Sequence, residues 1–398
     1  MRDFYCDLKF NSLRIDAEKK TIYSCWKAEG ENIDLNWLKE NPGQLFNTPT
    51  LQKERQQMLE NKRVASCEMT CFSKEDKNLW SPRLQYKNNP RLQYKDNLNK
   101  YKDVVATPTF LDIIISGECN MGCSYCCKEF SSTWRNDIYK NGDYNKFTKT
   151  YDRFKLSNVD LALRKVSQNE RTQLDSYRLI EQEIEKIIPN LKVLNISGGE
   201  PFLNDRLFKI LETAKNIPEI QLLSGLGIKQ ERFIRCVEQI KDYRNIKLRI
   251  SAESTEANYE FNRNGNTWKN FLNNLKILDD YKVEYFFNTT YSNLTVLDYV
   301  NFYTQFDSIV KNFNVVYEPD FMKPHVLDEE TKNTLINDFQ KSKFSNSYST
   351  VNLINLMQQP VTEDDRRNLE YFVKQFSMRR KTNTDFMPVS LQKWLNLC

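Results

Sequence analysis

The chain has 398 residues, of which 39% are hydrophobic and 28% are charged. A single hydrophobic core stops growing at roughly 250–300 residues, so this length predicts more than one folding unit. The composition is typical of a soluble globular protein, and no apolar stretch approaches the roughly 18 residues of a membrane helix. Residues 1–6 lack the apolar core of a signal peptide, so we expect a cytoplasmic protein.

The charges exclude further classes of function. The 58 basic and 53 acidic side chains leave a net charge of +5, and the densest basic run, 378–381, is short. Such a run is more typical of a solvated helix end than of a nucleic-acid footprint, so we expect neither a nucleic-acid nor a membrane partner. His325 is the one histidine of the sequence, which excludes metal sites built from several histidines. Acid–base chemistry by histidine would depend on this single residue, so we do not expect it.

Four of the ten cysteines lie in the first 71 residues. They are Cys6, Cys25, Cys67 and Cys71. Strand-like runs at 10–16 and 21–26 predict a hairpin near the first two, and a helical stretch at 51–63 precedes the last two. A cytosolic chain keeps its thiols reduced, so we do not interpret these cysteines as disulfides. Four thiolates could hold an iron–sulfur cluster or a structural zinc ion.

An eight-residue duplication follows this segment. Residues 82–89 recur almost identically at 90–97. The repeat is polar, and we interpret it as a sequence slip tolerated in an exposed linker over 81–104.

A buried-strand pattern at 110–115 ends in a glycine-containing loop with three closely spaced cysteines. Cys119, Cys123 and Cys126 follow the spacing C-x3-C-x2-C. Three such thiolates could hold three irons of one [4Fe–4S] cluster and leave the fourth iron open. Zinc is the alternative, although zinc normally takes two separated pairs of ligands.

Residues 128–175 form a long polar insertion after the cysteine loop. Its aromatic residues are Trp134, Tyr139, Tyr144, Phe147, Tyr151 and Phe154. Long loops in compact domains tend to be functional, so we favour a lid over an active site, with a decorated loop as the alternative.

A second buried strand is predicted at 191–197, and it ends in a glycine pair. The motif reads Gly198, Gly199, Glu200 and Pro201. Bare glycines let the backbone approach a ligand closely, although these four residues alone would be a turn. Helices are predicted at 180–188 and 233–240, and Cys236 lies on the apolar face of the second helix, so we assign it to the core.

Two further predicted strands, 246–253 and 283–290, end in polar side chains. These are Ser251, Glu253 and Asn288. Arg263 lies between the two strands. Without further information, the first three could simply be the polar residues that commonly end a strand. Arg263 could be an ordinary charged residue on the surface of a helix. Gly225 and Gly227 form another glycine-containing segment, between the helix at 180–188 and the helix at 233–240. This segment lacks the third glycine of a dinucleotide-binding loop.

Strand and helix patterns alternate from about 105 to 317, which predicts a parallel α/β architecture. The tail after 325 is polar and helical, and its apolar residues between 369 and 376 share one face, so we expect the tail to pack on the α/β domain. The expected parts are an N-terminal cysteine domain over 1–80, the polar linker over 81–104, the α/β domain over 105–324 and a helical C-terminal extension over 325–398.

The cysteine spacing, with Tyr125 just before Cys126, and the glycine motif at the next strand's end together resemble the radical S-adenosylmethionine (SAM) superfamily. The resemblance implies a partial (β/α)6 TIM-type barrel with its site at the carboxyl ends of the strands. It also implies that the three loop cysteines hold a catalytic [4Fe–4S] cluster. The carboxyl group or the backbone of the glycine motif would hold the SAM ammonium group, and Arg263 would pair with the carboxylate. The Ser-x-Glu segment would bind the ribose, and the fifth strand, at 283–290, would contact the adenosine. The residues implied to bind SAM are Tyr125, Gly198, Gly199, Glu200, Pro201, Ser251, Glu253, Arg263 and Asn288.

The N-terminal pattern resembles a twitch (half-SPASM) domain, in which a hairpin brings two cysteines and a later helix brings two more. Here it precedes the barrel, as in the group of radical SAM proteins with an N-terminal twitch domain. Two details depart from the pattern: Lys19 and Lys20 stand where a turn glycine is usual, and Cys67 and Cys71 form a loose pair. The resemblance implies that Cys6, Cys25, Cys67 and Cys71 hold a second, auxiliary [4Fe–4S] cluster, and zinc at the same cysteines is the alternative.

The chemistry implied by the resemblance is that of an oxygen-sensitive enzyme. A reductase such as flavodoxin or ferredoxin supplies one electron, SAM is cleaved to methionine and a 5′-deoxyadenosyl radical, and this radical abstracts hydrogen from a substrate. Relatives with an auxiliary cluster often modify peptides, so a peptide is the substrate we expect. Two other functions stay open: a methylthiotransferase-like enzyme that modifies tRNA, and a non-catalytic metal-binding interaction module.

Overall fold

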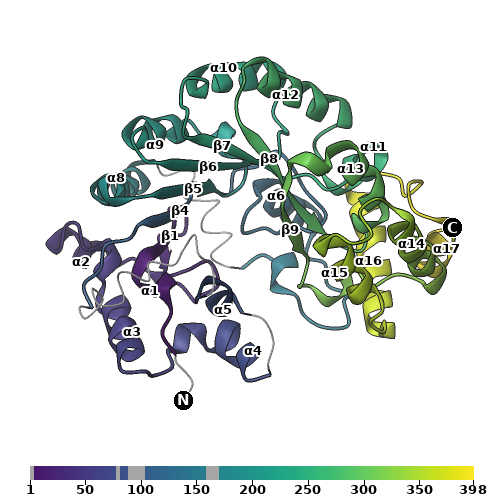
Figure 1. Cartoon of the computed structure of the whole chain (residues 1–398), viewed down its shortest axis with the longest axis horizontal. Coiled ribbons are helices and arrows are strands. Elements are labelled where there is room, and N and C mark those ends of the chain that lie inside the picture. The colour runs from purple at the N-terminus through teal and green to yellow at the C-terminus, as the bar shows by residue number, and fades with distance from the viewer. Residues whose placement is uncertain (1–3, 78–80, 88–103, 158–169) are drawn as a thin grey trace. The chain divides into compact units, whose positions relative to one another are not determined.

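The computed structural model describes residues 4–77, 81–87, 104–157 and 170–398 (Figure 1). The chain divides into two compact units. The first unit consists of Met1–Ser116, Lys165–Gly198 and Asp205–Gln221, and the second of Gly117–Arg164, Gly199–Asn204 and Leu222–Cys398. The division into four parts expected from the sequence stays a prediction.

The first unit has a mixed sheet with the order β3-β2-β1-β4-β5. Its strands are β1 (Ser12–Asp16), β2 (Thr21–Tyr23), β3 (Glu31–Asn32), β4 (Phe110–Ile114) and β5 (Val193–Ser197). Its helices are α1 (Asp7–Asn11), α2 (Leu35–Glu40), α3 (Pro49–Leu59), α4 (Ser73–Glu75), α5 (Pro82–Lys87), α8 (Glu170–Ile187) and α9 (Arg206–Ala214). Strand β6 (Glu219–Ser224) begins in this unit and ends in the second.

The predicted N-terminal hairpin forms, and it also extends the parallel sheet. Ile15 of β1 pairs with Ile22 of β2 in the antiparallel direction and with Ile113 of β4 in the parallel direction. Ile113 in turn pairs with Ile196 of β5, so a row of four buried isoleucines crosses strands β2, β1, β4 and β5. The pairing of β1 with β4 was not expected, because the two strands are almost 100 residues apart in the sequence.

The start of the predicted linker differs from an exposed connection. Residues 82–87 form helix α5, with Pro82 in its first turn. Ser81 precedes the helix and caps it, because its hydroxyl oxygen accepts a hydrogen bond from the Leu84 amide at 3.2 Å. Arg83 is buried, forms an ion pair with Glu75 and donates to the carbonyl of Tyr5 at 3.2 Å. The second copy of the duplication lies outside the described residues.

The second unit contains parallel strands in the order β7-β8-β9. They are β7 (Ile246–Ile250), β8 (Tyr285–Tyr291) and β9 (Val310–Val315). Its helices are α6 (Ser132–Asn141), α10 (Gln230–Ile240), α11 (Glu256–Asn262), α12 (Trp268–Asp280), α13 (Tyr299–Phe306), α14 (Glu329–Lys341), α15 (Tyr348–Met357), α16 (Glu363–Arg380) and α17 (Val389–Trp394). The mixed α/β fold with parallel strands and a helical C-terminal region is confirmed. Cys236 is buried on α10, and its thiol lies 3.8 Å from the carbonyl oxygen of Phe202.

The described part of the insertion is packed into the second unit. Trp134 of α6 is fully buried, and its ring centroid lies 5.9 Å from that of Phe376 and 6.5 Å from that of Phe372, both on α16. Tyr144 and Phe154 join the same cluster. The described part of the insertion therefore contributes to a core that it shares with α16, and residues 158–169 lie outside the described ranges.

Within the described residues, no helix combines the length and the apolar character needed to cross a membrane.

Candidate functional site

The loop after β4 holds the three predicted cluster cysteines in the second unit. Cys123 is buried, whereas Cys119 and Cys126 are partly exposed. The start of α6 fixes the loop: the amide of Cys119 donates to the Ser132 hydroxyl at 3.0 Å, and the indole nitrogen of Trp134 donates to the carbonyl of Cys123 at 2.9 Å. The aromatic insertion therefore supports the backbone that holds the thiols.

The three loop thiols are electrostatic neighbours. Burial and the adjacent Cys123 raise the pKa of Cys119 to about 12. A hydrogen bond with Cys127, burial and the charges of the other two cysteines raise the pKa of Cys126. In the described ranges no group of three or more His, Cys, Asp or Glu side chains is placed so that it could hold a metal ion. Three soft sulfur donors on one short loop nevertheless fit the donor set of an iron–sulfur cluster, which would displace their protons on binding.

The glycine motif lies against the cysteine loop. The amide of Glu200 donates to the carbonyl of Glu118 at 2.8 Å, and a Cβ atom at Gly199 would clash with that same carbonyl. Only glycine lets the two backbones approach this closely. Gly198 directly follows β5 and has a φ of +127°, and Pro201 begins the short helical turn η7 (Pro201–Leu203).

The carboxyl group of Glu200 is buried and holds the end of β6. Its oxygens accept hydrogen bonds from the Ser224 hydroxyl at 2.9 Å and from the Gly225 amide at 3.0 Å. Burial raises the pKa of Glu200 to about 7, although these hydrogen bonds lower it. The carboxyl group that the resemblance offered as a partner for the SAM ammonium is thus engaged with the protein.

Gly225 and Gly227 have a role that the sequence analysis missed. A Cβ atom at Gly227 would lie 2.5 Å from the sulfur of Met121, and one at Gly225 would lie 2.9 Å from it. The side-chain amide of Asn120 donates to the Gly227 carbonyl at 2.5 Å. The backbone after β6, which carries no side chains at Gly225 and Gly227, therefore packs directly against the cysteine loop. The two closely spaced glycines were the sequence feature that could have indicated this contact.

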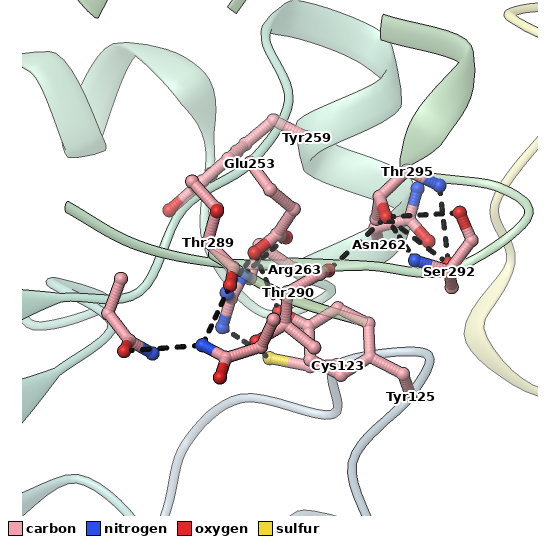
Figure 2. A network of polar contacts seen from close by, with 12 residues as sticks. Cys123, Tyr125, Glu253, Tyr259, Asn262, Arg263, Thr289, Thr290, Ser292 and Thr295 are labelled. Carbon is pink, nitrogen blue, oxygen red and sulfur yellow. Dashed lines mark hydrogen bonds and ion pairs between the residues drawn. The ribbon is translucent and has the colours of Figure 1, made fainter. Parts of the chain in front are cut away.

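A buried polar network joins three predicted site residues to Cys123. The Nε and Nη2 atoms of Arg263 donate to the two carboxylate oxygens of Glu253 at 3.1 and 2.6 Å, and its Nη1 lies 3.7 Å from the Cys123 sulfur. The Tyr125 hydroxyl donates to Glu253 at 2.9 Å, and the guanidinium lies 5.1 Å from the Tyr125 ring centroid. Figure 2 shows Arg263 between Glu253 and Cys123.

The electrostatics of this network favour a charged Arg263. Burial alone would lower the pKa of Arg263, but attraction to Glu253, Tyr125 and Cys123 outweighs burial and raises it. The side chains of Arg263 and Glu253 are only 6% and 0% exposed, so their charges are poorly screened by solvent.

Two other predicted SAM contacts, Ser251 and Asn288, make hydrogen bonds outside the network around Arg263. The amide of Ser251 donates to the Ser224 carbonyl at 2.9 Å, which ties the end of β7 to the end of β6. The side-chain oxygen of Asn288 accepts from Arg249 at 3.1 Å and from Asn314 at 3.4 Å. The contacts of Asn288 therefore run to the neighbouring strands β7 and β9.

The four N-terminal cysteines lie close together in the first unit. Cys6 precedes α1, Cys25 follows β2, Cys67 ends a short helical turn and Cys71 lies in the π-helical turn η3 (Glu68–Phe72). All four are buried, and the charges of the other three raise the pKa of Cys6 further above the value that burial gives it. The amide of Lys27 donates to the Cys25 sulfur at 3.3 Å.

Both a ligand role and a packing role fit these four thiols. Cys6, Cys25 and Cys67 share an apolar cluster with residues that include Phe10 and Phe72. Four sulfur donors match the donor set of a fully ligated cluster or of zinc. That these four cysteines bind one common ligand stays a prediction.

Residues 113–303 match the family model of the Radical SAM superfamily. The matched stretch contains the cysteine loop and the glycine motif. No match was found among curated proteins.

Several solved structures are similar to the chain at low identity. They include anSMEcpe with bound AdoMet and Kp18Cys peptide (15% identity, 57% of this chain, 58% of that chain, TM-score 0.36). They also include TYW1 with a lysine–pyruvate adduct bound (16%, 56% and 70%, TM-score 0.30). A third is Streptococcus suis SuiB bound to precursor peptide SuiA (14%, 96% and 71%, TM-score 0.31). The match spans 58% of the length of anSMEcpe.

Proposed function

We propose that the protein is a radical SAM enzyme in which Cys119, Cys123 and Cys126 hold a [4Fe–4S] cluster. When bound, the cluster and SAM supply reductive cleavage of SAM to a 5′-deoxyadenosyl radical, which takes a hydrogen atom from the substrate. The observation that carries the proposal is the contact between the two motifs. The Glu200 amide bonds to the carbonyl of Glu118, directly before Cys119, so the glycine motif and the thiols meet at one place.

The chain's own residues would position the reactants. The contacts of Gly199 with Glu118, and of Gly225 and Gly227 with Met121, would hold the cysteine loop in place, and the motif Gly198–Pro201 remains a proposed SAM contact. Ser251 and Glu253 at the end of β7 and Asn288 on β8 remain proposed SAM contacts, whereas Arg263, after α11, is already paired with Glu253. Tyr125 lies between Cys123 and Cys126 in the sequence and bonds to Glu253.

The N-terminal cysteines are proposed to hold an auxiliary [4Fe–4S] cluster, as the twitch resemblance implies. Four buried thiols in one unit support the proposal. A fully ligated cluster is suited to electron transfer, so it would accept an electron from the substrate or relay one. A peptide substrate and a flavodoxin- or ferredoxin-like reductase complete the proposal.

The first experiment tests SAM cleavage. Protein reconstituted anaerobically with iron and sulfide should form 5′-deoxyadenosine from SAM when dithionite is added, and Cys123→Ala should not. Cys236→Ala is the matched control, because Cys236 is a buried residue of α10 outside the proposed site. This variant should leave product formation unchanged. A fully reconstituted wild type that forms no product would contradict the enzyme proposal.

The second experiment counts metals. Two [4Fe–4S] clusters require about eight irons per chain. About four irons together with one zinc, the zinc lost in Cys67→Ala, would overturn the auxiliary cluster but leave the first proposal intact. Retention of labelled tRNA, rather than peptide, on the reconstituted enzyme would favour the methylthiotransferase-like alternative instead.

A further inference from the structure

Arg263 already has a carboxylate partner within the chain. Its Nε and Nη2 atoms donate to both oxygens of Glu253, which is the fork geometry in which arginine binds a carboxylate most strongly. The Glu253 oxygen at 2.6 Å also accepts from Tyr125. The side of the guanidinium that carries Nε and Nη2 is therefore already occupied by a carboxylate of the protein.

The third nitrogen of the guanidinium points elsewhere. Nη1 lies 3.7 Å from the sulfur of Cys123, in a region where Arg263 and Glu253 are almost fully buried. A charge acts over several ångströms in such surroundings, because little water screens it. Arg263 is thus a fixed positive charge beside one proposed ligand of the site cluster, and Glu253 is the negative charge on its far side (Figure 2).

We propose that Arg263 is a positioning residue that acts through Cys123: it orients this sulfur and raises the reduction potential of the cluster proposed on the loop cysteines. A positive charge near the sulfur stabilises the state that carries the extra electron, and the Glu253 carboxylate partly cancels this effect. The inference rests on the proposed function, since it requires a cluster at Cys119, Cys123 and Cys126. It assigns Arg263 to the cluster rather than to the carboxylate of SAM.

The test compares two variants that each remove one charge of the Arg263–Glu253 ion pair, because they should shift the reduction potential in opposite directions. The reduction potential of the site cluster is measured without SAM, by electron paramagnetic resonance during titration with a one-electron reductant such as Ti(III) citrate. Arg263→Gln removes the positive charge and leaves Glu253, so the potential should fall. Glu253→Gln removes the negative charge and leaves Arg263, so the potential should rise. We expect a change of about tenfold in the reduction equilibrium in each direction, which is ~59 mV for one electron.

Further variants separate charge from structure. Arg263→Lys keeps the charge and should restore most of the potential that Arg263→Gln loses. Glu370→Gln removes a charge from an ion pair with Arg366 on α16 and should not shift the potential. The spectrum of Cys123→Ala serves as the baseline, because it contains only the signal of any other cluster. If Arg263→Gln does not assemble a cluster, Glu253→Gln and Arg263→Lys decide the question by themselves.

Each outcome has a distinct meaning. Shifts of the same sign in both glutamine variants, or no shift in Glu253→Gln, would overturn the inference, because a purely structural role cannot give opposite signs. If wild type shows no signal beyond that of Cys123→Ala, the proposed function itself fails.

Discussion

Glu200 is a buried acid whose protonation should make the stability of the chain depend on pH. Burial raises its pKa from 4.5 to about 7. The folded state therefore retains a proton that the unfolded state has lost between these two values, so stability falls as the pH rises through this window. Glu200→Gln mimics the protonated acid, and the variant should lack this dependence.

The measurement is the free energy of unfolding of the metal-free protein in denaturant at pH 4.5 and pH 7.5. The stability of wild type relative to Glu200→Gln should decrease by up to ~3 kcal/mol between these values, since one pKa unit corresponds to about 1.4 kcal/mol. Other titrating groups are common to both proteins and cancel in the comparison. Parallel pH profiles for the two proteins would show that the fold does not raise the pKa of Glu200.

Gly199 and Gly225 both lie against the cysteine loop, but they should respond differently to an added methyl group. At Gly199 the methyl group would meet the backbone carbonyl of Glu118, which is held by the Glu200 amide and cannot move alone. At Gly225 the nearest atom is the sulfur of Met121, 2.9 Å away, and this flexible side chain can turn aside. Gly199→Ala should therefore lose most of the iron bound at the site, and Gly225→Ala should keep it.

Iron and 5′-deoxyadenosine are measured for both glycine variants after identical reconstitution. An equal loss in the two would mean that the backbone contact at Gly199 is not what holds the loop. The sequence predicted the importance of the glycine motif, but not its partner. The close approach is to another loop, and a single sequence does not indicate which backbone that is.

The strands and amphipathic helices are the elements that the sequence predicted best. The runs at 110–115 and 191–197 became β4 and β5, and their pattern is legible because both faces of a parallel strand are buried. The N-terminal run was extended too far, since residues 7–11 form helix α1 before β1 begins. The packing of the insertion was missed because its aromatic residues follow no helical or strand period and meet α16 about 220 residues later.

The contact between the insertion and α16 predicts a strong effect of Phe372. This ring is 1% exposed and lies within 6.5 Å, between centroids, of Trp134, Tyr144 and Phe154. Because Trp134 also holds the carbonyl of Cys123, Phe372→Ala should destabilise the fold by about 3–5 kcal/mol and loosen the cysteine loop. Denaturant unfolding and iron content after reconstitution measure the two effects.

Met378 provides the control on the same helix. It is 64% exposed, so Met378→Ala removes a side chain of similar length without leaving a cavity. That variant should stay within about 0.5 kcal/mol of wild type. A similar loss of stability in both variants would contradict the interpretation that the aromatic core, rather than the helix surface, carries the energy.

At the scale of the whole chain, the sequence indicated a cysteine-rich N-terminal part and an α/β part, but not how the sheet joins them. Strand β1 pairs with β4 in parallel, so the first unit combines the N-terminal hairpin with strands of the predicted barrel. Pairing between strands that are distant in the sequence depends on tertiary contacts, which periodicity does not encode. The three loop cysteines, in contrast, share one short loop because they are near in sequence, and their role as cluster ligands stays a prediction.

The two sets of proposed ligands belong to different units, and this separation predicts additive loss of iron. Cys6, Cys25, Cys67 and Cys71 are in the first unit, and the loop cysteines are in the second. Cys67→Ala and Cys123→Ala should each lower the iron content by about four per chain, and the double variant should bind almost none. Mössbauer spectra of the single variants should show one intact [4Fe–4S] cluster each. A loss of all iron in either single variant would mean that the two sites do not assemble independently, and unchanged iron in Cys67→Ala would mean that the N-terminal thiols are core residues.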